Sequence, residues 1–109
     1  MTSNTMKTDL SPARRRLVEK MQWVNHGSIE GLPVRNGEPV FDPPPRFVRR
    51  VQFGKENGPR LEAEKADFAL KADVIELFTA LDELGDCVIT QLKIQDGLPK
   101  MMTFEELCA

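Results

Sequence analysis

A chain of 109 residues is long enough to bury a core without disulfides or metals, and it predicts one domain. Hydrophobic residues make up 40% and charged residues 29%, as in soluble globular proteins, and no run approaches the roughly 18 apolar residues of a membrane span. The net charge of −2 hides an asymmetry: residues 1–60 carry 11 Lys and Arg against 6 Asp and Glu, whereas residues 61–109 carry 4 against 11. The halves can neutralise each other on folding, associate head to tail, or offer the basic half to an anionic partner.

The first predicted element is a helix. Residues 1–10 are polar and aperiodic, so we expect a flexible N-terminus. Ser11 is a typical N-cap and Pro12 suits the first helical position, while Gly27 is a natural stop. The apolar residues of this segment fall on one helical face, and they are Ala13, Leu17, Met21 and Val24.

A hairpin is predicted over residues 29–41, IEGLPVRNGEPVF, because Asn36-Gly37 is the strongest short signal for a two-residue turn. That turn would place on one face Leu32, Val34, Pro39 and Phe41. Prolines cannot donate to a ladder, so we expect an edge or irregular ribbon. After three consecutive prolines, residues 46–53 are typical of a third strand and residues 54–59 of a loop, whereas residues 60–72 are ambiguous.

The second half repeats this order. Asp73, with Glu76 three residues later, is expected to cap a second helix, and Gly85 to end it. A second hairpin is predicted over residues 89–101, ITQLKIQDGLPKM, and residues 103–109 are expected to form a short terminal turn. Its core face would consist of Leu92, Ile94, Pro99 and Met101.

The predicted order is α-β-β-β-α-β-β, an α+β fold in which two helices pack on one face of an antiparallel sheet, with residues 11–109 as a single domain. The second hairpin lies sixty positions after the first, and both follow a helix that ends at glycine. Two explanations remain open: duplication of an αββ unit over residues 11–53 and 62–104, or chance recurrence of common hairpin chemistry.

The shared residues are Gly27, Asn36-Gly37 and Pro39 in the first half, and Gly85, Asp96-Gly97 and Pro99 in the second. On these residues each half resembles very short bacterial proteins of unknown function, which consist of little more than one helix and one hairpin. The resemblance implies an architecture. It implies no activity and assigns no catalytic or binding residue.

The residues that ligate metals are too few and too dispersed for a site. A structural zinc site needs about four Cys or His ligands in close pairs, whereas the chain has His26, Cys87 and Cys108 far apart. We therefore expect no metal and no cofactor. Two free thiols fit a reducing compartment, and MTSNTMKTDL does not read as a secretion signal, so we expect a cytoplasmic protein.

The sequence also predicts that the protein is not an enzyme. The single histidine, His26, falls at a helix end, where a capping role is the ordinary one. Acidic pairs occur on polar faces, where nothing separates their pKa values for acid–base work. The glycines at 54 and 58 lack the strand-to-helix context of a phosphate loop. No catalytic residue is therefore assigned.

Two non-enzymatic functions remain. The first is an adaptor or regulatory module that binds another protein or a second copy of itself, a homodimer included. Trp23 lies off the apolar stripe beside Arg16 and Lys20, as an interface anchor would. The alternative is that Trp23 packs under the three prolines.

The second is nucleic-acid binding by the basic half of the chain. Phe47 and Phe53 are interleaved with basic residues on the third strand, which suits phosphate contact and base stacking. The candidate contacts are Arg14, Arg15, Arg16, Arg46, Arg49 and Arg50. An overall pI near 5.4 counts against a dedicated binder, and we favour the interaction module.

Overall fold

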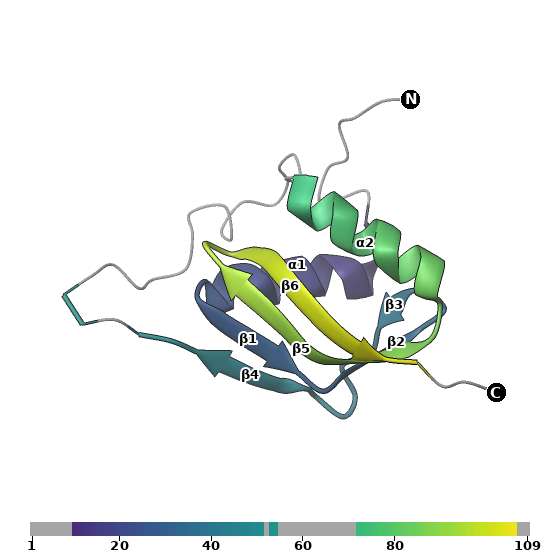
Figure 1. The fold of residues 1–109 in the computed structure, drawn as a ribbon, viewed down its shortest axis with the longest axis horizontal. Coiled ribbons are helices and arrows are strands. Elements are labelled where there is room, and N and C mark those ends of the chain that lie inside the picture. The colour runs from purple at the N-terminus through teal and green to yellow at the C-terminus, as the bar shows by residue number, and fades with distance from the viewer. Residues whose placement is uncertain (1–9, 52, 55–71, 107–109) are drawn as a thin grey trace.

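The structure is a computed structural model that describes residues 10–51, 53–54 and 72–106. Within these residues the chain forms two helices and one six-stranded antiparallel sheet, which confirms the predicted α+β class (Figure 1). The elements are α1 (Pro12–Val24), β1 (Gly27–Glu30), β2 (Leu32–Arg35), β3 (Glu38–Pro39), β4 (Arg46–Arg49), α2 (Ala72–Leu84), β5 (Cys87–Gln95) and β6 (Leu98–Glu105). Each of the two helices has 13 residues and is too short to cross a membrane.

Strand β5 is the centre of the sheet. On one side it pairs with β6, and on the other it pairs with β1 and β2, which follow one another along its length. The short strands β3 and β4 continue the sheet outward from β2 and β1. The two hairpins therefore belong to one sheet (Figure 1).

One continuous core joins both helices to one face of the sheet. Its apolar side chains come from the helical stripes expected from the sequence and from the inward positions of the central strands, and burying each contributes about 1.5–3 kcal/mol. These side chains are Leu17, Val18, Met21 and Val24 on α1, Val74, Leu77, Phe78 and Leu81 on α2, and Ile29, Leu32, Val34, Ile89, Leu92 and Ile94 on the sheet.

The chain changes face between β1 and β2, and again within β5. Ile29 and Leu32 are both fully buried although they are three residues apart, and strict alternation would turn one of them outward. Gly31, with φ of 72°, lies between them and re-aims the chain. In β5 the buried Ile89 and Leu92 have the same spacing. These irregularities keep each strand's apolar residues on the core face.

Helix α1 begins as predicted and ends differently. The Ser11 hydroxyl accepts a hydrogen bond from the backbone N–H of Arg14 (3.2 Å). Asn25, with φ of 60°, occupies the C-cap position in place of the expected Gly27. Gly27 instead opens β1, where an added Cβ would lie 1.9 Å from the carbonyl oxygen of Val48. Position 27 therefore requires glycine because β4 passes so close to it, and not because the helix ends there.

Both hairpin turns have the predicted conformation. Asn36 and Asp96 have φ of 52° and 55°, and the glycines after them have φ of 75° and 74°, as a two-residue turn between twisted strands requires. The predicted core face is wrong at Met101. The β5–β6 register shifts beside Ile94, so Met102 lies opposite Leu92 and packs against the core, while Met101 is 59% exposed.

Three boundaries also differ from the predictions. Strand β4 ends at Arg49, so Val51 and Phe53 are exposed and lie outside it. Strand β6 continues to Glu105, where a turn was expected. Helix α2 already includes Ala72, and the carboxylate of Asp73 accepts a hydrogen bond from Lys100 Nζ (3.0 Å) in place of a capping role. The ambiguous residues 60–71 lie outside the described part.

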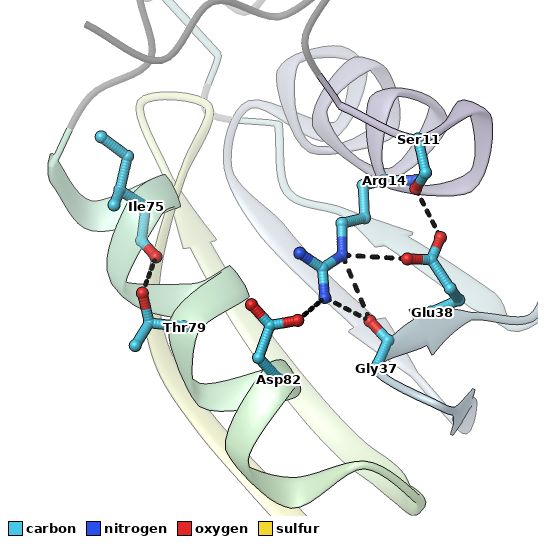
Figure 2. Close-up of polar contacts among 7 residues, drawn as sticks. All are labelled: Ser11, Arg14, Gly37, Glu38, Ile75, Thr79 and Asp82. Atoms are coloured by element: carbon cyan, nitrogen blue, oxygen red, sulfur yellow. Dashed lines mark hydrogen bonds and ion pairs between the residues drawn. The ribbon is translucent and has the colours of Figure 1, made fainter. Parts of the chain in front are cut away.

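Arg14 ties the start of α1 to the first turn and to α2 (Figure 2). Its guanidinium donates from Nε and from one terminal nitrogen to the carbonyl oxygen of Gly37 (3.2 and 2.8 Å). It also pairs with Glu38 (3.3 Å) and with Asp82, and its Cζ lies 5.1 Å from the centroid of the Phe78 ring. The Arg14 side chain is 13% exposed, so these contacts are structural.

We expect Arg14→Met to lower the free energy of unfolding by about 2 kcal/mol, because the Gly37 carbonyl and two carboxylates lose a charged donor while the aliphatic stem is kept. Urea unfolding measures the change. Arg15→Met, one residue further along the same turn, is the control and should change stability by less than about 0.5 kcal/mol. Equal effects of the two substitutions would contradict a structural role for Arg14.

Candidate interaction surface

One stripe of α1 faces outward beside the edge strand β4. Arg16, Lys20 and Trp23 lie four and three residues apart, which places them on the same side of the helix. Arg16 is exposed, Lys20 is half-buried, and Trp23 keeps 41% of its surface exposed. The three residues singled out in the sequence as an interface therefore share one surface.

Two phenylalanines extend this stripe. The ring of Phe47 on β4 packs edge-on against Trp23, with centroids 6.2 Å apart and an interplanar angle of 86°, a geometry worth about 0.5–1.5 kcal/mol beyond burial. Phe41 follows β3. Both phenylalanines are half-buried and pack against the core. Trp23 thus packs against Phe47, which follows the three prolines in the sequence, and the rest of its ring is accessible to solvent.

Three cations lie over these rings. Arg49 Cζ is 4.6 Å from the Trp23 centroid. Lys20 Nζ is 5.7 Å from the same centroid and 5.5 Å from that of Phe47, and Arg16 Cζ is 5.0 Å from the Phe41 centroid. Each contact is worth about 0.5–1 kcal/mol at an exposed site. We call this group the Trp23 surface, and it consists of Arg16, Lys20, Trp23, Phe41, Phe47 and Arg49.

The arginines proposed for nucleic-acid binding are divided among several places. Arg16 and Arg49 belong to the Trp23 surface. Arg14 forms ion pairs with Glu38 and Asp82, as described above. Arg46 is exposed and lies 3.6 Å from Glu30. Arg15 is half-buried and Arg50 is exposed.

A hollow of about 600 Å³ lies next to β4, where it meets β1 and β5. Its lining includes Arg49 and Arg50 from the basic half of the sequence, and Lys93 and Lys100 from the acidic half. The remaining lining residues are Gly27, Ser28, Val48, Gln91, Ile94 and Gln95. The sequence did not reveal this cationic hollow, because Lys93 on β5 and Lys100 on β6 join it only through the pairing of β5 with β1 and with β6.

The residues with potential for catalysis lie apart from this surface. The Nδ1 atom of His26 accepts a hydrogen bond from the backbone N–H of Asp96 (3.4 Å), so His26 supports the second turn. Cys87 is a free, buried cysteine at the start of β5; Cys108 lies outside the described residues. Among the described residues, His, Cys, Asp and Glu side chains do not gather in groups of three as metal ligands would.

Burial raises the pKa of the Cys87 thiol, and the negative charges of Glu106 and Asp86 raise it further. At neutral pH the thiol is therefore kept in its protonated, weakly nucleophilic form.

A comparison with protein-family models, curated proteins and solved structures finds no match to the chain. The functional argument therefore rests on the geometry of the Trp23 surface.

In a Cys108→Ser background, we expect iodoacetamide to alkylate Cys87 more slowly in the native protein than in urea, because folding buries the thiol and raises its pKa, which lowers the thiolate fraction. Because the folded-state pKa is raised, the native rate should climb only above the pH at which the unfolded thiol ionises. Stability linked to this group should fall as the pH rises through that range. Mass spectrometry of timed samples gives both rates, and equal native and unfolded rates would contradict the burial argument.

Proposed function

We propose that this protein is a non-enzymatic interaction module that binds an acidic segment of a partner protein through the Trp23 surface. The observation that carries the proposal is the exposed Trp23 ring, framed by Lys20 and Arg49 and supported from beneath by Phe47. Tryptophan and arginine are the residues most enriched at the energetic centres of protein interfaces.

The rings and cations already hold each other in place before a partner arrives. Ordering long side chains costs about 0.5–1.5 kcal/mol each on binding. Part of that cost is offset here, because Arg16, Lys20 and Arg49 each lie over a ring in the free protein. A carboxylate that reaches these cations while an apolar side chain covers Trp23 matches the surface in both charge and polarity.

A second copy of the chain also has this chemistry. Glu76 and Glu83 are exposed on α2, so the acidic helix of one molecule matches the basic surface of another. This contact is head to tail, because it joins two different surfaces. Self-association is therefore one form that the proposed interaction takes.

Nucleic-acid binding is the second candidate function. It is favoured by the cationic hollow, which adjoins the Trp23 surface through their shared residue Arg49. Phosphates could occupy the hollow while a base stacks near Trp23. The acidic net charge of the whole chain weighs against it.

The cytoplasm is the proposed location. The buried Cys87 is a free thiol, and free thiols are usual in that reducing compartment.

The test is selection of binders from a random peptide display library on the immobilised protein. Enriched peptides should combine Asp or Glu with an apolar residue, and Trp23→Ala should weaken their binding by about 30-fold, the equivalent of roughly 2 kcal/mol at an interface centre. Phe104→Ala is a matched control, because Phe104 is an aromatic residue with a similar exposed fraction, 38%, on β6. It should leave binding unchanged, and thermal unfolding checks that both variants fold.

Two further measurements separate self-association and nucleic-acid binding from the binding of another protein. A light-scattering mass above 12.3 kDa that falls to the single-chain value in Trp23→Ala identifies a second copy as the partner. A random DNA and RNA pool measured at about 50 and 200 mM salt tests the rival. Tight nucleic-acid binding with a steep salt dependence that Arg49→Gln/Arg50→Gln reduces, together with no enriched peptide, would reject the protein-binding function.

A further inference from the structure

The helices, central strands and turns of the two halves match at a constant offset, although β3 has two residues where β6 has eight, and β4 has no counterpart among the described residues. Helices α1 and α2 both have 13 residues, and they begin at Pro12 and Ala72, sixty residues apart. The segment formed by β1 and β2 begins at Gly27, and β5 begins at Cys87. The change of face between Ile29 and Leu32 recurs between Ile89 and Leu92. The correspondence therefore includes an irregularity of the strands as well as the regular elements.

The central ladder pairs equivalent residues reciprocally. Ile29 lies opposite Leu92, and Leu32 lies opposite Ile89. Under the sixty-residue offset, Ile89 is the equivalent of Ile29 and Leu92 that of Leu32. Ile29 thus faces the equivalent of Leu32, and Leu32 faces the equivalent of Ile29. This exchange is the pattern of an isologous interface about a two-fold axis.

The turns repeat this reciprocity at both ends of the ladder. The backbone N–H of Gly37 donates to the carbonyl oxygen of Gly85 (2.7 Å), and that of Gly97 donates to the carbonyl oxygen of Asn25 (3.0 Å). Gly85 and Asn25 are equivalent residues just beyond α2 and α1. Each hairpin turn therefore closes on the end of the other half's helix.

The adjacent turn residues make a second equivalent pair of contacts. The backbone N–H of Asn36 donates to Asp86 Oδ1 (2.8 Å), and that of Asp96 donates to His26 Nδ1 (3.4 Å). Asp86 and His26 are again sixty residues apart. Asp86 and His26 have different side chains, yet each accepts a hydrogen bond from the backbone N–H of the equivalent turn residue.

We infer that the chain consists of two αββ units, residues 12–41 and 72–101, that bind each other as the subunits of a symmetric dimer do, and that each unit's partner surface is specific for the unlike unit. The surface is the ladder of β1 and β2 with β5 and the two turn-to-helix contacts. The kind of partner that it fits is an αββ unit, supplied here by the same chain.

The specificity comes from one network that the two-fold relation does not repeat. Arg14 and Glu38 of the first unit meet Asp82 of the second. The equivalents of these three residues are Val74, Leu98 and Gln22, none of which is charged. Val74 is buried, and the Oε1 atom of the buried Gln22 has no hydrogen-bond partner.

Like units would pair less well than unlike ones. Two second units would bring the carboxylate of Asp82 toward Val74 and Leu98, where no cation is present. Two first units would set Gln22 where Arg14 now meets Asp82, and an ion pair would be lost. Only the unlike pair supplies both the arginine and its second carboxylate.

The first test cuts the folded, full-length chain at a protease site inserted after Arg60. We expect the two pieces to stay together on gel filtration at micromolar concentration, with the circular dichroism of the uncut protein, and to show a melting temperature that now depends on concentration. Arg14→Met should raise the dissociation constant of the cut protein at least tenfold, while Arg15→Met should leave it unchanged. Pieces that separate, or that lose helical signal or precipitate after the cut, would overturn the inference.

The second test builds the missing network at the equivalent position. Val74→Arg alone should lower the melting temperature strongly, or prevent folding, because it buries an unpaired cation. Adding Leu98→Glu and Gln22→Asp should recover at least half of that loss, or restore folding, since the three residues then reproduce Arg14, Glu38 and Asp82. If the three substitutions instead add up to a larger loss, the two sites are not equivalent and the inference fails.

Discussion

The structure depends on the pairing of β5 with β1 and β2. An amphipathic helix and a short hairpin of about thirty residues cannot bury enough apolar surface to be stable alone, because chains below about 40 residues usually need an additional constraint. The central ladder supplies it by joining two such sets of elements into one sheet. The fully buried Ile29, Leu32, Ile89 and Leu92 lie along this ladder and receive the stripes of both helices.

The same pairing creates the candidate surface. With β5 at the centre, β4 becomes an edge strand, and its Phe47 and Arg49 come to lie beside the outer stripe of α1. Trp23 is then supported on one side and open on the other. Gly27 permits the close approach of β4 that this requires, since any side chain there would meet Val48. Function, as proposed, is thus a consequence of strand order.

Local signals were sufficient for much of the fold. The Asn36-Gly37 turn, the Ser11 cap and the helical stripes depend on neighbours in the sequence, and each was predicted from it. The errors arose where distant residues decide. Met102 replaces Met101 in the core because of a shift in the β5–β6 ladder. The ion pair between Arg14 and Asp82 was not predicted either, because the two residues are far apart in the sequence. The candidate surface was anticipated at Arg16, Lys20 and Trp23. The contacts of Trp23 with Phe47 and Arg49 depend on the position of β4, and that of Arg16 with Phe41 on the chain after β3.

The reciprocal turn-to-helix contacts have a consequence for how such a protein can change. In a dimer of identical chains every substitution occurs twice, so a residue that suits one side of the axis must also suit the other. Joining the units in one chain removes this restriction and makes their association intramolecular. The positions equivalent to Arg16, Lys20 and Trp23 are Glu76, Ala80 and Glu83. The two-fold framework that we infer thereby carries one basic, aromatic surface and one acidic surface on its described residues, so the two sides of the molecule differ in charge.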